Sequence, residues 1–204
     1  MSLTELEVLL ERLNGFPSPK PKLEQYTTPS WLAARILHTA EIRDDLSDPV
    51  VDLGCGTGVF AVGAASMGYR SIGVDVDAEA LEIASEDAGN LLGCEAPDWI
   101  TADVDHLPLD TSGGSVVMNP PFGAQHRGAD RKFLDKASSL SSVTYSIHNS
   151  GSMEFVESYV RDLEPEGRVT DVFEASIYLE RRFDFHEKDR EEVDVEVHRI
   201  EFRR

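Results

Sequence analysis

Apolar and polar positions follow two periods along the chain, one typical of helices and one of short buried strands. Apolar residues three or four apart predict helices over Thr4–Leu13, Pro29–Ala40, Val59–Met67 and Ala78–Leu92, and others beginning near Phe133 and Ser152. Short apolar runs predict strands over Val50–Leu53, Ser71–Asp75, Trp99–Ala102, Val116–Met118 and Val143–Ile147. This alternation of strands and helices predicts an α/β fold with a mostly parallel sheet.

Two longer strands are predicted at the end of the chain. No helical pattern separates Val169–Leu179 from Val193–Phe202, so these strands are expected to pair antiparallel. The apolar residues of the last strand change phase after Val197. This change predicts a β-bulge near His198 and Arg199.

The first predicted strand runs into a glycine-rich turn that directly precedes a helix. Gly54, Gly56 and Gly58 lie in this turn, and glycines there let the backbone approach a ligand at the helix N-terminus. A dinucleotide fingerprint requires another glycine where Val59 stands. Glycine at every second position, two residues after Asp52, instead resembles motif I of class I S-adenosylmethionine-dependent methyltransferases.

Acidic residues follow the next two predicted strands. Asp75 ends the second strand, where a carboxylate suits two ribose hydroxyls. It can alternatively cap the following helix, although Asp77 is equally placed to do so. Asp103 follows the third strand. In the resembled fold its carboxylate meets the adenine amino group of the cofactor, and the Val104 backbone amide meets a nitrogen of the same ring. The plainer interpretation of Asp103 is an ordinary aspartate in a turn.

The sequence Asn119-Pro120-Pro121-Phe122 follows the fourth predicted strand and is the predicted centre of the chemistry. Two prolines end the strand and fix a rigid lip, with Asn119 held extended. The Asn119 amide oxygen can accept a hydrogen bond from an exocyclic amino group, and Phe122 offers a face to a planar ring. A simple turn after a strand is the alternative.

Two polar segments flank these motifs. The segment around Gln25 and Thr28 is either a plain loop or a cover over the ligand pocket that contributes these two side chains. A cluster of cations after the lip either contacts a substrate backbone phosphate or is a solvated helix start. Its members are Arg127, Arg131, Lys132 and Lys136.

The composition is strongly acidic, with 38 Asp and Glu against 19 Lys and Arg, a net charge of −19 and a pI of about 4.6. Dispersed carboxylates with few lysines resemble the proteins of salt-accumulating halophiles. Acidity argues against nucleic-acid binding. That objection weakens in molar salt, where the Debye length is about 3 Å.

Cysteine content and hydropathy predict the compartment. Cys55 and Cys94 form no CxxC pair or Cys/His cluster, so we expect neither a disulfide nor a metal site, and a reducing cytoplasm. No apolar run reaches about 18 residues, so no membrane association is expected.

The order of motifs resembles the small-subunit ribosomal RNA adenosine-N6 methyltransferases of the methyltransferase-like-five type. The resemblance implies a seven-stranded class I fold over residues 1–204, with an N-terminal helix and crossing segment over about 1–30, S-adenosylmethionine as cofactor and an archaeal, halophilic source. It rests on Leu23–Tyr26, Asp52–Gly56, Met118–Gly123, Tyr145–His148 and Val193–Val197. Together with motif I, it implies cofactor contacts at Gln25, Thr28, Asp52, Gly54, Gly56, Thr57, Gly58, Val59, Asp75, Asp103 and Val104, and an acceptor site at Asn119, Pro120, Pro121 and Phe122.

The resemblance leaves other planar amino groups open as acceptors, since protein-glutamine and guanine-N2 methyltransferases share the Asn-Pro-Pro-aromatic lip. A non-catalytic binding module is the alternative from another class. The resemblance also implies a Trm112-type zinc-ribbon activator that adds a strand to the sheet edge. Trp99 and Ile100 on the third strand would form that edge, unless Trp99 packs under the neighbouring helix.

Overall fold

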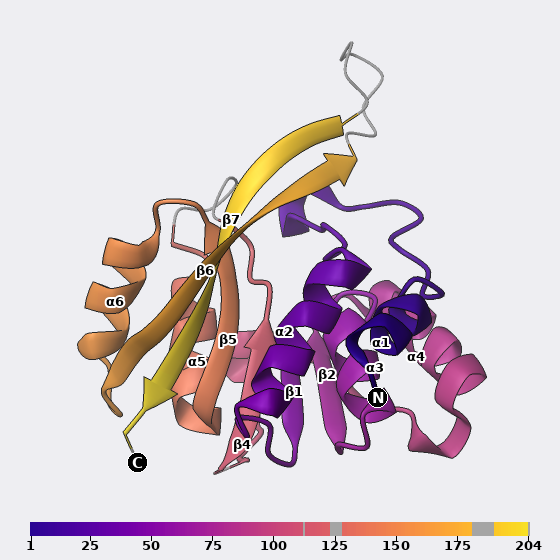
Figure 1. The fold of residues 1–204 in the computed structure, drawn as a ribbon, viewed down its shortest axis with the longest axis horizontal. Helices are drawn as coiled ribbons and strands as arrows, with labels where there is room; N and C mark the ends of the chain where they lie inside the picture. The colour runs from indigo at the N-terminus through magenta and orange to yellow at the C-terminus, as the bar shows by residue number, and fades with distance from the viewer. Residues whose placement is uncertain (112, 123–127, 181–189, 204) are drawn as a thin grey trace.

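The computed structural model describes residues 1–111, 113–122, 128–180 and 190–203. Seven strands form one sheet in the order β3-β2-β1-β4-β5-β7-β6 (Figure 1). Strands β1 to β5 are parallel, and β7 pairs antiparallel with β5 and β6. The predicted α/β sheet with an antiparallel final hairpin is therefore confirmed. The strands are β1 Val50–Leu53, β2 Ser71–Asp75, β3 Asp98–Thr101, β4 Gly114–Met118, β5 Ser141–Asn149, β6 Gly167–Glu180 and β7 Arg190–Phe202.

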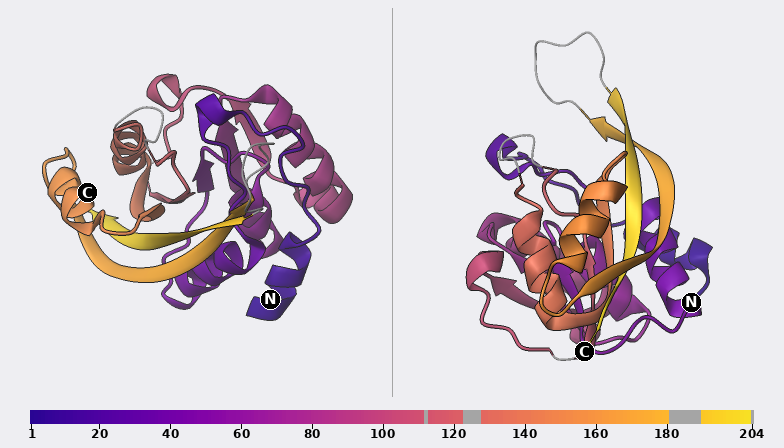
Figure 2. Two further views of the ribbon diagram at one scale, coloured as in Figure 1. Left: turned by 90° about the horizontal axis from the view of Figure 1, so that it is seen from above. Right: turned by 90° about the vertical axis from the view of Figure 1, so that its left-hand side faces the viewer.

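Helices cover both faces of the sheet (Figure 2), as expected for a parallel sheet whose strands are apolar on both sides. One apolar cluster joins the sheet mainly to the first three helices, with Ala88 from the fourth, and is called the cluster beside α1 to α3 below. A second cluster joins the sheet to the last two helices and is called the cluster beside α5 and α6. The helices are α1 Leu3–Leu10, α2 Ser30–Ile42, α3 Val59–Ser66, α4 Ala78–Leu92, α5 Arg131–Leu140 and α6 Met153–Arg161, with 3-10 turns at Pro21–Leu23, Gly93–Glu95 and Val104–His106.

The carboxyl ends of the parallel strands meet at one edge of the sheet. Leu53 at the end of β1 lies beside Val74 of β2 and Met118 of β4. The segments that leave these three strands therefore start side by side, and they carry the glycine-rich turn, Asp75 and Asn119. Ligands of open α/β sheets bind in the crevice outside such strand ends.

The change of phase in β7 reflects a change in the face that is buried. Val197 packs in the cluster beside α1 to α3, whereas Ile200 packs in the cluster beside α5 and α6. The irregularity lies in the partner strand β6, where Thr170 is inserted opposite the step from Arg199 to Ile200. The predicted bulge near His198 and Arg199 is thus confirmed in position, and the extra residue belongs to β6.

The edge position of β3 is confirmed, but its tryptophan does not form an outward apolar surface. Trp99 pairs with Gly73 of β2, and its indole lies where a side chain at Gly73 would stand. Trp99 packs against the cluster beside α1 to α3, and Ile100 packs against the opposite one. The side chains expected to invite a partner are therefore directed into the fold, because glycine on β2 leaves room for the ring.

The remaining expectations concern cysteines, metals and membranes. Cys55 is buried, Cys94 is exposed, and both are free thiols. Among the described residues, no three His, Cys, Asp or Glu side chains form a group that could hold a metal ion. In the same part of the chain, no helix has the length and hydropathy needed to cross a membrane.

Candidate cofactor and acceptor site

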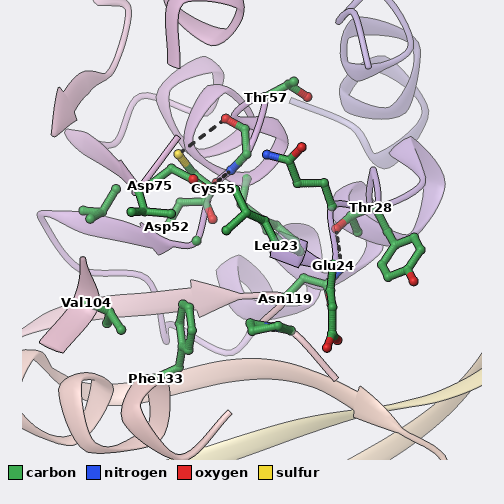
Figure 3. Close-up of a pocket in the computed structure, with 18 of the residues that line it drawn as sticks. Leu23, Glu24, Thr28, Asp52, Cys55, Thr57, Asp75, Val104, Asn119 and Phe133 are labelled. Carbon is green, nitrogen blue, oxygen red and sulfur yellow. Dashed lines mark hydrogen bonds between the residues drawn. The ribbon is translucent and has the colours of Figure 1, made fainter. Parts of the chain in front are cut away.

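A cavity of about 320 Å³ opens at the carboxyl ends of β1, β2 and β4 (Figure 3). Its walls come from the glycine-rich turn, from the loops after β2, β3 and β4, from the start of α5 and from the segment before α2. Many predicted site residues line it: Gln25, Thr28, Asp52, Gly54, Gly56, Thr57, Val59, Asp75, Asp103, Val104, Asn119, Pro121 and Lys132.

The glycine-rich turn is shaped by left-handed backbone and by three aromatic rings. Its glycines have φ values of +72°, +53° and +85°, and the Gly58 amide donates to the Cys55 carbonyl over 2.8 Å. A Cβ at any of the three would stand 2.5–2.9 Å from a ring carbon. Residues other than glycine are therefore excluded both by the left-handed backbone and by contact with a ring. The rings are Phe133 at Gly54, Phe16 at Gly56 and Trp99 at Gly58.

Asp75 joins the glycine-rich turn to the start of α4. Its Oδ2 accepts from the Gly56 amide and its Oδ1 from the Asp77 amide, each over 2.8 Å. Asp77 itself caps α4 by accepting from the Glu79 amide over 3.1 Å. The capping role thus belongs to Asp77. Burial raises the pKa of Asp75, and its carboxylate faces the pocket with capacity for further donors.

Asp52 lies at the base of the pocket. It is buried, and its Oδ2 accepts from the Ala61 amide of α3 over 3.0 Å. Burial raises the pKa of Asp52 to about 8, because a carboxylate in an apolar setting is poorly solvated. Figure 3 shows Asp52 and Asp75 on one side of the pocket, with Val104 and Phe133 on another.

Asp103 is paired with a predicted RNA-binding cation. Lys132 Nζ lies 3.0 Å from Asp103 Oδ1 and 3.8 Å from Asp105 Oδ2. The hydrogen bond from Lys132 lowers the pKa of Asp103. The Asp103 side chain also accepts from the Asp105 amide over 3.2 Å and so caps the short turn that carries Val104.

The other predicted cations also have internal partners or cannot be placed. The Arg131 guanidinium lies over the rings of Phe155 and Tyr159, at 5.5 and 5.7 Å from their centroids. Lys136 Nζ donates to the Leu107 carbonyl over 3.0 Å. Arg127 lies outside the described residues. RNA contact by these cations therefore stays a prediction.

The segment over residues 14–28, here called the strap, is attached to α4 at two points. In the second half of the helix, Asp87 accepts from the Asn14 backbone N–H over 2.6 Å and from the Asn14 side chain over 2.7 Å. At the N-cap, Asp77 accepts from Gln25 Nε2 over 2.7 Å and from Lys20 Nζ over 2.8 Å. Gln25 lines the pocket, yet its amide nitrogen is directed to Asp77 and its oxygen accepts from the Lys20 amide.

The acceptor lip contains an unusual buried atom. Asn119 Nδ2 donates to Thr28 Oγ1 of the strap over 3.0 Å, and the two side chains point toward each other in Figure 3. Asn119 Oδ1 is buried and has no hydrogen-bond partner among the described residues. A buried carbonyl oxygen of this kind is costly. Asn119 lines the cavity, and the bond to Thr28 fixes the orientation of its amide.

Three of the residues predicted to contact the cofactor or the acceptor do not line the cavity, and neither do the predicted cations Arg131 and Lys136. Gly58 instead begins α3 as its N-cap. Pro120 lies between lining residues, and Phe122 is half-buried against the apolar cluster beside α1 to α3. Sequence reasoning also missed several lining residues. Phe133 was assigned only to a helix, and Cys55 only to the turn; the others missed are Phe16, Lys22, Leu23, Glu24, Tyr26, Thr27, Phe60, Val74, Val76, Ala102 and Ala129.

Comparison with known proteins agrees with this geometry. A family model described as a methyltransferase domain matches residues 50–141. The protein MJ0284 of Methanocaldococcus jannaschii is 40% identical over 96% of this chain and 92% of its own. The rRNA N(6)-adenosine-methyltransferase METTL5 of Danio rerio is 35% identical over 99% of both chains. The crystal structure of PH1948 from Pyrococcus horikoshii matches with a TM-score of 0.87 and 36% identity over 99% of this chain and 98% of that one.

Proposed function

Because the chain belongs to the METTL5 family of rRNA N6-adenosine methyltransferases, we propose that it methylates the exocyclic amino group of an adenosine in ribosomal RNA, most directly that of the small subunit. Its cofactor is S-adenosylmethionine, as in the class I methyltransferase fold. The cytoplasm is the compartment proposed with this substrate. The predicted site residues keep the roles given to them above as part of this proposal.

The observation that carries the proposal is the unpartnered Asn119 Oδ1. An adenine amino group supplies an N–H donor that would satisfy this buried oxygen. Thr28 accepts from Asn119 Nδ2 over 3.0 Å, so the amide is oriented before any substrate arrives. An oriented acceptor costs little reorganisation when the base enters.

The residues around the pocket fit the cofactor. The narrow glycine-rich turn leaves space beside it, and the Asp75 carboxylate can accept from ribose hydroxyls while it holds the Gly56 amide. The bound cofactor supplies an electrophilic methyl group on a cationic sulfur. The Asp75 carboxylate at this end of the pocket favours a cation.

On the acceptor side, the chain's task is orientation. Adenine nitrogen is a weak nucleophile because its lone pair is delocalised into the ring. Acceptance of one N–H by Asn119 and of the other by the Pro120 carbonyl would shift electron density onto nitrogen. Positioning and preorganised acceptors of this kind supply several kcal/mol without a strong base. The base must leave its stack to reach the cavity, so a loop or single strand is the expected target.

Labelled S-adenosylmethionine with ribosomal subunits, naked rRNA or a release factor tests the proposal. We expect label in rRNA that is recovered as N6-methyladenosine after digestion to nucleosides. N2-methylguanosine, or label in a protein glutamine, would overturn the adenosine assignment and support one of the related amino-group acceptors. Cofactor binding without transfer to any of the three would favour a binding module.

We further propose that a Trm112-type zinc-ribbon activator pairs with the edge strand β3. Because Trp99 and Ile100 pack inward, the available features are the free backbone edge and the exposed side chains of Asp98 and Thr101. Co-expression with the activator followed by a pull-down tests this. A proline at Thr101 would remove an edge N–H and is expected to reduce capture. Full activity of the isolated chain, unchanged by the activator, would contradict it.

A halophilic source is proposed from the charge, and an archaeal one from the family resemblance. Thirty-eight acids against 19 bases repel one another in dilute buffer, and molar salt shortens the Debye length to about 3 Å. We therefore expect the melting temperature to rise between low and molar potassium chloride. A melting temperature that stays constant across this range would remove the halophile assignment.

A further inference from the structure

Of the three rings that press on the glycine-rich turn, Trp99 alone does not line the pocket. Phe16 and Phe133 are part of the cavity wall. The Trp99 ring instead touches the turn at Gly58, where Cη2 lies 2.5 Å and Cζ3 lies 3.0 Å from the place of a Cβ. The turn therefore has a pocket side formed by Gly56 and Thr57 and a second side that rests on an indole.

The indole reaches the turn across a gap in the neighbouring strand. Trp99 is paired with Gly73 in the β2–β3 ladder. A Cβ at Gly73 would overlap the six-membered ring and would stand 3.1 Å from Cys55 Sγ. Ala84 of α4 borders the same place, since its Cβ is 3.1 Å from the position of a Cβ at Gly58. One side chain thus fills the space between β3, β2, α4 and the turn.

We propose that Trp99 is a positioning residue for the cofactor, acting through the turn over residues 55–58. The inference rests on the proposed function only for the identity of the cofactor. The backbone from Cys55 to Gly58 is closed by one hydrogen bond of 2.8 Å, and the Gly56 amide is held to Asp75 over 2.8 Å. Without a ring behind it, glycine backbone can move away from the pocket, and Asp75 loses the alignment that the ribose hydroxyls require.

The neighbouring residue provides a matched control. Ile100 lies on the same edge strand and is also half-buried, but it packs on the opposite face of the sheet. Trp99→Leu and Ile100→Ala therefore both remove apolar volume from β3, and only the first faces the turn. A role limited to core packing would lower the melting temperature in both variants without separating their cofactor affinities.

Calorimetry with S-adenosylmethionine and thermal melts of both variants test the proposal. We expect Trp99→Leu to raise the Kd about tenfold, the loss expected when one or two hydrogen bonds are misaligned. The kcat at saturating cofactor should stay within about twofold, because the acceptor lip is untouched. Ile100→Ala should keep the Kd within about twofold of the wild-type value. Equal Kd changes in the two variants would overturn the proposal.

Two further variants protect the test against loss of folding. Trp99→Phe keeps a ring over Gly73 while shortening its reach toward Gly58, so its Kd should lie between those of the wild type and Trp99→Leu. Gly73→Ala in the Trp99→Leu background adds a methyl group to the vacated space and should recover part of the affinity. Failure of both to change the Kd would also overturn the role of the ring. If the wild-type protein does not bind S-adenosylmethionine, the proposed function fails instead.

Discussion

The glycine-rich turn and the acceptor lip both line the pocket, but they differ in whether their buried polar atoms have hydrogen-bond partners. Both oxygens of Asp75 accept backbone N–H groups, and a ring presses on each glycine of the turn. At the lip, Asn119 Oδ1 is buried without a partner among the described residues. The donor half thus holds its shape through packing and completed hydrogen bonds. In the proposed function, the acceptor half keeps this oxygen for a hydrogen bond from the substrate.

The largest effect is expected when the acceptor atom is removed. Asn119→Ala should lower kcat about 10²–10³-fold, the cost seen when a preorganised polar group is lost from a reaction site. Cofactor affinity should stay within a few-fold, since Asn119 faces the acceptor. Single-turnover methyl transfer with rRNA, together with calorimetry, measures both quantities. Transfer at the wild-type rate would mean that the lip is only structural.

On the donor side, Asp75→Ala should weaken S-adenosylmethionine binding by about 1–3 kcal/mol, the cost of hydroxyl contacts left unpaired. The substitution also frees the Gly56 and Asp77 amides, so a melt is needed to show that the variant is folded. Calorimetry gives the affinity. An unchanged Kd in a folded variant would contradict the ribose assignment.

A smaller effect is expected when the hydrogen bond between the strap and Asn119 is removed. Thr28→Val keeps the shape of the side chain but removes the oxygen that accepts from Asn119 Nδ2, so the amide is no longer held in one orientation. We expect kcat at saturating cofactor to fall about five- to tenfold, the value of one neutral hydrogen bond. Thr28→Ser retains the hydroxyl and should recover most of the rate. Equal rates for Val and Ser would argue against orientation by the hydroxyl.

The smallest effect concerns stability and pH. The pKa of Asp52 is raised to about 8 by burial, so between pH 4 and 8 the folded chain holds a proton that the unfolded chain releases. Stability from this group is therefore lost as pH rises toward 8. Without cofactor, Asp52→Asn should have a higher melting temperature than the wild type at pH 9, because the variant has no buried charge at this position. The rise should be about 2–4 °C for each kcal/mol by which the charged Asp52 destabilises the fold, and the difference should shrink toward pH 4. A difference that is constant with pH would contradict the raised pKa.

Features encoded over a few adjacent residues were predictable. The glycine-rich turn, Asp75, Asp103 and Asn119 all lie at or immediately after the ends of predicted strands, and parallel strands bring their carboxyl ends together. The parallel sheet followed from the alternation of helical and strand patterns along the chain. Its antiparallel end followed from the lack of a helical pattern between the last two predicted strands. These signals are local, so no knowledge of long-range pairing was needed.

Features that depend on distant partners were not predictable. Nothing in the strap indicates that Thr28 contacts Asn119, 91 positions away, or that Gln25 contacts Asp77, 52 positions away. The inward packing of Trp99 depends on Gly73 lying beside it in the β2–β3 register. A periodic pattern reports which face of an element is apolar, but it does not report the residue across the interface.

The attachment of the strap to α4 and β4 has a consequence for the order in which the site forms. Residues 14–28 are synthesised before their contact partners Asp77, Asp87 and Asn119. The strap therefore closes over the pocket only after a large part of the sheet has been made. Long-range closures of this kind are slow steps in folding. Recovery of cofactor binding during refolding should consequently lag behind the recovery of helical circular dichroism.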